Sequence, residues 1–176
     1  MRTPARQPAL PVTEHSPLAP PSLYGAGKVM LENLAADYHR WHGIAIAGLR
    51  LSRIIYDNPQ GRAKLRRLVE SPDLGADCLW SYVDARDVAT ACQAWIESDR
   101  DGAEVFNLAA PEVHKTEPVA ELLAGSVYRS FGKIPLGAHE TPFCSRKIRE
   151  MLGWKPRYDW RQILAEPAVP GSPETS

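Results

Sequence analysis

The amino-acid sequence predicts an α/β fold with a parallel sheet. Amphipathic helical patterns alternate along the chain with short apolar runs, the order expected when helices connect neighbouring parallel strands. The run at 44–52 is apolar almost throughout, which is typical of a strand buried on both faces. The pattern that precedes it, over 25–42, places apolar side chains at helical spacing.

The first 22 residues form a proline-rich segment. Their proline density excludes a helix and favours extended or turn backbone. We expect the first ten residues to be disordered. The prolines are Pro4, Pro8, Pro11, Pro17, Pro20 and Pro21.

A helix is predicted at 25–42, and Gly43 is a natural stop for it. Its apolar stripe contains Leu31, Leu34 and Tyr38. The buried strand at 44–52 follows. Since ligands of open parallel sheets bind beyond the carboxyl ends of the strands, residues 52–55 lie where a ligand is expected.

The middle of the chain contains four further elements. A basic helix at 61–71 precedes a loop at 72–79. The cations of this helix are Arg62, Lys64, Arg66 and Arg67. We interpret them as a solvated face rather than as a surface that steers an anionic substrate. A short strand at 80–83, a helix from Asp84 or Asp87 to about Ser98, and a strand at 104–108 come next.

The last third is predicted to be less regular. Thr116 is expected to cap a helix over 117–125, and residues 126–143 read as irregular. Ser145 is expected to cap a helix that ends near Gly153, and Asp159 to cap a last turn over 160–165. The tail at 166–176 is rich in Pro and Ser and is expected to be disordered.

Composition excludes several classes of function. The 176 residues carry 21 basic and 21 acidic side chains, so neither nucleic acid nor an anionic membrane is an expected partner. No apolar run approaches the ~20 residues of a membrane span, and no secretory signal follows Arg2 and Arg6. Cys78, Cys92 and Cys144 are widely spaced, which favours buried free thiols in a reducing cytoplasm over a metal site or a disulfide framework.

Tyr24 and Lys28 form the candidate catalytic pair. Residues four apart lie on one face of a helix, one turn from each other. An ammonium close to a phenol favours the phenolate, so such a tyrosine can exchange a proton with a sugar hydroxyl or carbonyl near neutral pH. A phosphate-binding loop is the alternative for Gly25-Ala26-Gly27-Lys28, but Val29 stands where that loop needs Ser or Thr.

The wider context of this pair resembles a known family. Residues 10–20 read Leu-Pro-Val-Thr-Glu-His-Ser-Pro-Leu-Ala-Pro, and Tyr24 and Lys28 follow at the spacing found in the extended short-chain dehydrogenase/reductases, the NAD-dependent epimerase/dehydratases. The resemblance continues through Trp-Ser-Tyr-Val-Asp-Ala-Arg-Asp-Val-Ala at 80–89 and Leu-Gly-Trp-Lys-Pro at 152–156, to about residue 164.

The resemblance implies a fold and a site. The fold would be a partial Rossmann-like, doubly wound parallel sheet with a small substrate-side C-terminal region. Tyr24 and Lys28 would be catalytic and would also contact NAD or NADP. Ser52 and Ile54 would bind the same cofactor. Many relatives have Asn at the position of Arg53. Arg53 would either bind a carboxylate or phosphate of a sugar or nucleotide-sugar substrate, or be a solvated charge without a function.

The resemblance covers only the second half of a typical family member. No G-x-G-x-x-G turn occurs in the chain, so the N-terminal nucleotide-binding half is expected to be absent. Family members have a Ser or Thr shortly before the Leu-Pro-Val segment, which completes a Ser/Thr-Tyr-Lys set. In this chain only Thr3 could take that place, and it is a weak substitute. We therefore expect a truncated gene, a late start codon or one half of a split protein, with residues 23–165 as its folded part.

Two functions compete at this point. The chain is either the catalytic half of an NAD(P)-dependent oxidoreductase or epimerase, or a non-catalytic remnant that serves as an interaction module. The first needs a dinucleotide. The second needs a homo-oligomer or a completing partner chain. The missing strands would leave a sheet edge unpaired. The missing neighbour of helix 25–42 would leave an apolar strip of that helix uncovered.

Overall fold

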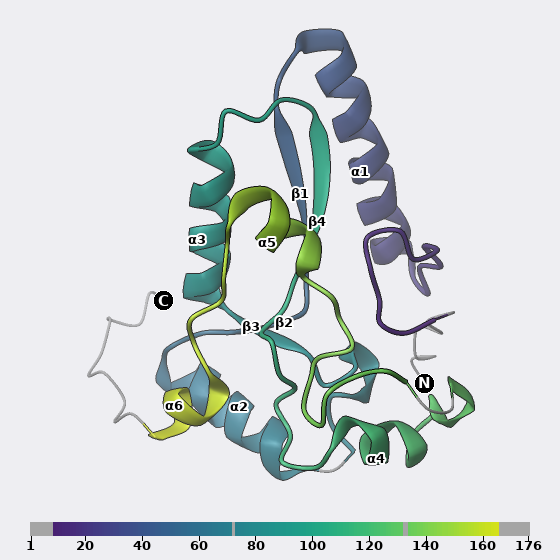
Figure 1. Cartoon of the computed structure of the whole chain (residues 1–176), viewed down its shortest axis with the longest axis vertical. Helices are drawn as coiled ribbons and strands as arrows, with labels where there is room; N and C mark the ends of the chain where they lie inside the picture. The colour runs from purple at the N-terminus through teal and green to yellow at the C-terminus, as the bar shows by residue number, and fades with distance from the viewer. Residues whose placement is uncertain (1–8, 72, 132–133, 166–176) are drawn as a thin grey trace.

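The computed structural model describes residues 9–71, 73–131 and 134–165. Disorder was predicted for the first ten residues and for the tail at 166–176. Residues 1–8 and the whole tail lie outside the part of the chain that the structure describes. The long helix α1 (Leu23–His42) stands at one side of the molecule in Figure 1, and the remaining helices surround two small sheets.

The two sheets are parallel, as predicted, and each has two strands. Strand β1 (Ile46–Leu51) pairs with β4 (Ala103–Leu108), and β2 (Arg53–Ile55) pairs with β3 (Tyr82–Asp84). The prediction of one strand over 44–52 was wrong in two ways. The strand begins later, and the chain leaves the first sheet after Leu51 and enters the second at Arg53.

Helices cover both faces of the β1–β4 sheet (Figure 1). Helix α1 lies on one face, where Arg50 of β1 forms a two-fold ion pair with Glu32 of α1. Helices α3 (Ala85–Ile96) and α5 (Arg146–Leu152) lie on the other, where Phe106 and Leu108 are fully buried. Strand β1 is only half-buried, contrary to prediction, since it pairs with β4 alone among the described residues and α1 covers it loosely.

The β2–β3 sheet has its own core. Helices α2 (Pro59–Glu70) and α6 (Trp160–Ala165) pack there around Ile55 and Tyr82. A third cluster joins α4 (Val119–Ala124) to the short 3₁₀ turns at Ala76–Cys78 and Arg129–Phe131. The prediction of an irregular 126–143 is confirmed apart from the turn at Arg129–Phe131, within the residues described there.

The predicted helix caps hold in part. Asp84 caps α3 by accepting from the amide of Arg86, and Asp159 accepts from Arg161 at the start of α6. The predicted cap of α4 was wrong, whereas Ser145 stands at the N-cap of α5 as predicted but makes no side-chain cap bond. Helix α4 starts after Pro118 without a side-chain cap, and the hydroxyl of Ser145 accepts from the amide of Ala109 instead of capping α5.

Helix α2 corrects the prediction of a solvated basic face. Arg62 is buried, forms an ion pair with Asp57 and donates to the carbonyl of Ile163. Lys64, Arg66 and Arg67 are exposed, as predicted. The difference arises because α6 packs against α2 and covers the side that carries Arg62.

The Asp84-Ala85-Arg86-Asp87 segment has a structural role. Arg86 bridges Asp84 and Asp57. The carboxylate of Asp87 is buried and accepts from the amides of Arg157 and Tyr158. Burial raises the pKa of Asp87, although these two amides oppose the shift. The segment therefore joins β3 and α3 to the C-terminal region.

The described part of the proline-rich segment has no helix and is bonded to β4 and to residues 142–144. Val12 is buried and pairs with the backbone of Pro142 and Cys144. The side chain of Glu14 accepts from the amide of Asn107 in β4. These bonds hold the approach to α1 against the rest of the fold.

The cysteines are free, as predicted, but none of the three is buried. Cys92 is exposed on α3, whereas Cys78 and Cys144 are half-buried. Among the described residues, no helix combines the length and apolar character that crossing a bilayer requires.

Candidate functional site

A cleft of about 1110 Å³ runs along β1, beside α1, to the start of β2. All five residues predicted for the site line it, namely Tyr24, Lys28, Ser52, Arg53 and Ile54. Helix α1 contributes the first two, and the chain that leaves the carboxyl end of β1 contributes the others. The structure thus brings together residues from two separate parts of the sequence.

One side of the cleft is an open strand edge. Bonds from the amide of Ile46 to Gly102 and from the amide of Ser52 to Leu108 show which residues of β1 face β4. Because alternate residues of a parallel strand bond to opposite sides, Ala47, Leu49 and Leu51 direct their backbone groups to the other edge. No described strand pairs with that edge.

Tyr24 and Lys28 occupy the first turns of α1. Ser22 caps this helix by accepting from the amide of Gly25, which fixes where the helical turn begins. The ammonium of Lys28 lies 5.3 Å from the centre of the Tyr24 ring, so the prediction that both lie on one face is confirmed. The Tyr24 side chain is 76% exposed and accessible from the cleft.

The two glycines of this turn have different surroundings. A Cβ on Gly25 would lie 2.9 Å from the Cβ of Pro20, so the proline-rich segment packs closely only because this residue is glycine. A Cβ on Gly27 would meet no described residue within 4 Å. Close approach therefore explains Gly25 and does not explain Gly27.

Ser52 lies where the two sheets meet. Its amide donates to Leu108, whereas its buried hydroxyl has no partner among the described residues. A buried hydroxyl without a partner costs free energy unless a ligand or water satisfies it. Since Ser52 lines the cleft, this hydroxyl is suited to hold a polar group of a ligand there.

Arg53 is not a solvated charge, because two of its nitrogens are paired within the fold. Its Nη2 donates to both carboxylate oxygens of Asp77, at 2.7 and 2.9 Å, and its Nε donates to Sγ of Cys78 at 3.4 Å. Burial opposes the charged form, but Cys78 and Asp77 outweigh it and raise the pKa of Arg53. For the Cys78 thiol, burial raises the pKa, because it also disfavours the charged form of this group, and Arg53 opposes the shift.

The site extends further than the sequence suggested. A neighbouring cavity of about 340 Å³ is lined by Ser52 and Arg53 together with Asp77, Cys78 and Tyr128. Burial raises the pKa of Tyr128, the largest side chain of the set. No local pattern marks these three residues, because they lie far along the chain and reach Arg53 only through the tertiary fold.

The residues present fit one end of a dinucleotide. The cleft offers a polar hydroxyl at Ser52, a cation at Lys28 and an apolar surface at Ile54, which suits a flat ring that carries an amide. No glycine-rich turn for a pyrophosphate occurs in the sequence. The fit therefore extends to the nicotinamide end and not to the phosphates.

Comparison with solved structures identifies the class of fold. UDP-N-acetylglucosamine 4-epimerase from Bacillus cereus superposes with a TM-score of 0.61 at 20% identity, over 91% of this chain and 57% of the epimerase. A short-chain dehydrogenase/reductase superfamily protein from Agrobacterium tumefaciens with bound NAD gives 0.60 at 19% identity, over 91% and 60% of the two chains. UDP-glucose 4-epimerase from Bifidobacterium longum, in complex with NAD⁺ and UDP, gives 0.58 at 17% identity, over 92% and 58%.

The sequence identifies the family. Residues 3–109 match the model of the NAD dependent epimerase/dehydratase family, and the chain belongs to that family. No curated protein matches the sequence significantly. The chain spans between 57% and 60% of the length of the three structures above. The Rossmann-like fold class and the family resemblance are thereby confirmed.

Proposed function

We propose that this chain is the catalytic, substrate-side part of an NAD(P)-dependent oxidoreductase or epimerase that acts on a sugar or nucleotide-sugar. The observation that carries the proposal is the cleft in which Tyr24 and Lys28 meet residues 52–54. The names of the structural neighbours, sugar-nucleotide epimerases among them, support the substrate class. The free cysteines suit a reducing cytoplasm.

Each residue has a distinct role in this proposal. Tyr24 exchanges a proton with a substrate hydroxyl or carbonyl, and its exposed phenol can reach a ligand in the cleft. The ammonium of Lys28 stabilises the negative charge left on the phenol oxygen and binds the cofactor ribose. The hydroxyl of Ser52 and the side chain of Ile54 orient the nicotinamide, which supplies hydride transfer when bound.

Arg53 would hold a phosphate or carboxylate of the substrate. Its Nη2 and Nε already contact Asp77 and Cys78, so an incoming anion would bind beside Asp77 and share the guanidinium with it. The contact with Asp77 orients the guanidinium toward the cavity that also contains Tyr128. This arrangement gives the substrate one charged anchor at the end of the cleft.

We expect the chain to need a completing polypeptide before it turns over. The cleft lacks a pyrophosphate-binding turn, and the edge of β1 that faces it is unpaired within the described residues. Calorimetric titration of the folded chain with NADH is expected to show no binding. Micromolar binding would mean that the chain builds the whole cofactor site by itself.

The catalytic assignment has its own control in the same helix. In an assembly that contains a partner with a glycine-rich turn and binds NADH, Tyr24→Phe is expected to lower kcat about a hundredfold or more. Tyr38→Phe, on α1 but outside the lining of the cleft, is expected to leave kcat unchanged. Equal kcat values for wild type and Tyr24→Phe would refute the role of Tyr24.

A second function is supported by the surface of α1. None of the residues of this helix is buried, although Met30, Leu31, Leu34, Tyr38 and Trp41 are large and apolar. An exposed apolar face of this kind marks an interaction surface. The chain would then be an interaction module, and the open edge of β1 would add backbone hydrogen bonds to the same interface.

We expect the chain to associate through α1. Light scattering at tens of micromolar should give a mass above the 19.5 kDa of one chain, and Leu34→Glu with Trp41→Glu should restore that value. The control is Ile96→Glu, which places one such charge at a residue of α3 that is 79% exposed. A monomeric wild type, or an equal effect of Ile96→Glu, would contradict this surface assignment.

A further inference from the structure

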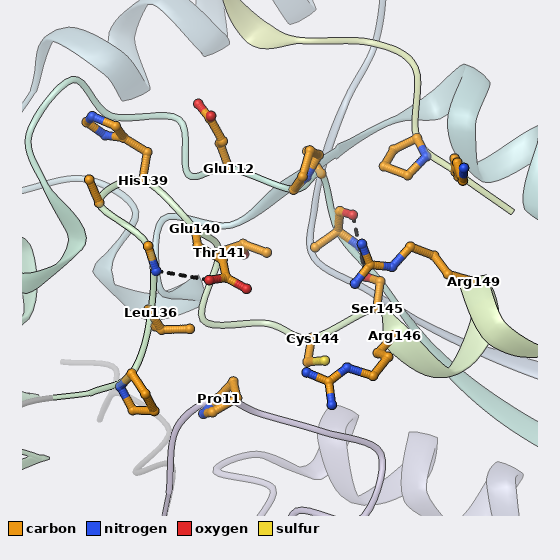
Figure 2. A pocket seen from close by; sticks show the side chains of 18 residues that line it. Pro11, Glu112, Leu136, His139, Glu140, Thr141, Cys144, Ser145, Arg146 and Arg149 are labelled. Carbon is orange, nitrogen blue, oxygen red and sulfur yellow. Dashed lines mark hydrogen bonds between the residues drawn. The ribbon is translucent and has the colours of Figure 1, made fainter.

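A second cavity lies on α5, away from the Tyr24 cleft. It has a volume of about 690 Å³, within the range of small-molecule sites, and shares no lining residue with that cleft. Its walls come from the chain after β4 (residues 109–112), the loop at 135–141, and α5 with the segment that follows it. Figure 2 shows these walls facing a common space.

Three cations line this cavity, and none of them forms an ion pair within the described part of the chain. Arg146 and Arg149 are one turn apart on α5, and Lys155 follows the helix. In Figure 2, the guanidinium groups of both arginines reach from α5 into the cavity. Within residues 9–71, 73–131 and 134–165, the side chains of these three residues make no hydrogen bond or salt bridge.

The other cation of this helix is paired, unlike these three. Lys147, between the two arginines in sequence, forms an ion pair with Glu104 and donates to the carbonyl of Val105. Like charges placed one turn apart repel one another. An anion that bound between Arg146 and Arg149 would relieve this repulsion.

The carboxylates of the cavity are already engaged. Glu112 forms an ion pair with Arg161 at 2.9 Å, and Glu140 accepts from the amide of Gly137 at 2.9 Å. They lie across the cavity from the arginines in Figure 2. His139 also lines the cavity, and its buried Nδ1 has no partner within the described residues. The wall formed by α5 is therefore the one with unused positive charge.

We propose that this cavity binds a small organic molecule that carries a phosphate group. A guanidinium presents two parallel donors to a phosphate, and two such groups with Lys155 match its double negative charge better than the single charge of a carboxylate. The volume leaves room for more than a free phosphate ion, and the second carboxylate oxygen of Glu140 offers an acceptor to a hydroxyl group at the opposite wall. The site is separate from the proposed catalytic cleft.

Ribose 5-phosphate is the probe for this site, with ribose and inorganic phosphate as partial probes. In calorimetry or by amide chemical shifts, the folded chain is expected to bind ribose 5-phosphate with a Kd of about 1 mM or lower, and ribose not at all. Arg146→Ala and Arg149→Ala should each weaken binding about tenfold, because each removes a charge-assisted contact. Both side chains are exposed, so the variants should fold.

The control is Arg66→Ala, which removes an equally exposed arginine from α2 and should leave the Kd unchanged. Tyr24→Phe should also leave it unchanged, so failure of the catalytic proposal and failure of this one are distinguishable. The proposal is overturned by a wild-type chain that does not bind ribose 5-phosphate at millimolar concentration. It is equally overturned if inorganic phosphate binds as tightly, or if Arg66→Ala weakens binding as much as the α5 variants.

Discussion

Arg62→Ala is expected to lower the free energy of unfolding by about 3 to 5 kcal/mol, because it leaves the partly buried carboxylate of Asp57 with one cation fewer and removes the bond to Ile163. The side chain is only 6% exposed, so water cannot replace the lost donors well. Urea denaturation followed by circular dichroism measures the loss. Asp57 retains its contact with Arg86, which keeps the effect from being larger.

The same helix provides the control for this substitution. Arg66→Ala removes the same side chain from an exposed position of α2 and is expected to change the stability by less than about 0.5 kcal/mol. Losses of equal size in the two variants would mean that α2 is weakened by lost packing of the arginine side chains, and that the buried ion pair contributes little.

Stability is expected to fall between about pH 6.5 and pH 4 because of His114. This side chain is fully buried, and neither ring nitrogen has a partner within the described residues. Burial, with help from Lys115 and Arg53, lowers the pKa of His114 from 6.5 to about 4. The unfolded chain therefore takes up a proton at a pH where the folded chain cannot.

The sign and the window follow from the two pKa values. Above pH 6.5 the imidazole is neutral in both states and the pH has no effect through it. As the pH falls toward 4, the loss grows to at most about 3 kcal/mol, and below pH 4 it levels off. Urea midpoints of wild type and His114→Phe at pH 7 and pH 4.5 test this. The wild type should lose more stability than the variant, and parallel losses would show that other groups dominate.

Local spacing predicted the parts of the molecule that depend on local geometry. Helix α1 and strand β4 begin and end within two residues of their predicted limits, since their apolar periods are long and clear. The contact between Tyr24 and Lys28 follows from helical spacing alone. The place of residues 52–54 beside them follows from the general position of ligands at strand ends.

Tertiary packing determines what the sequence did not reveal. Arg62 resembles its exposed neighbours Arg66 and Arg67, and only the packing of α6 distinguishes it. The strand is interrupted at Ser52, where no glycine or proline marks a break in the sequence. The interruption arises because the chain pairs with β4 before Ser52 and with β3 after it. Asp77 and Cys78 meet Arg53 through a loop whose path no periodicity predicts.

The backbone pairing of Val12 with Pro142 and Cys144 has a consequence for the order of folding. This contact joins residues that are about 130 positions apart, so the chain must close a very long loop to form it. Contacts of such long range form late, after the local helices and hairpin-scale structure. Helix α1 can coil early and pack on β1 and β4, but the segment that leads into it is fixed at Val12 only when the last third of the chain is in place.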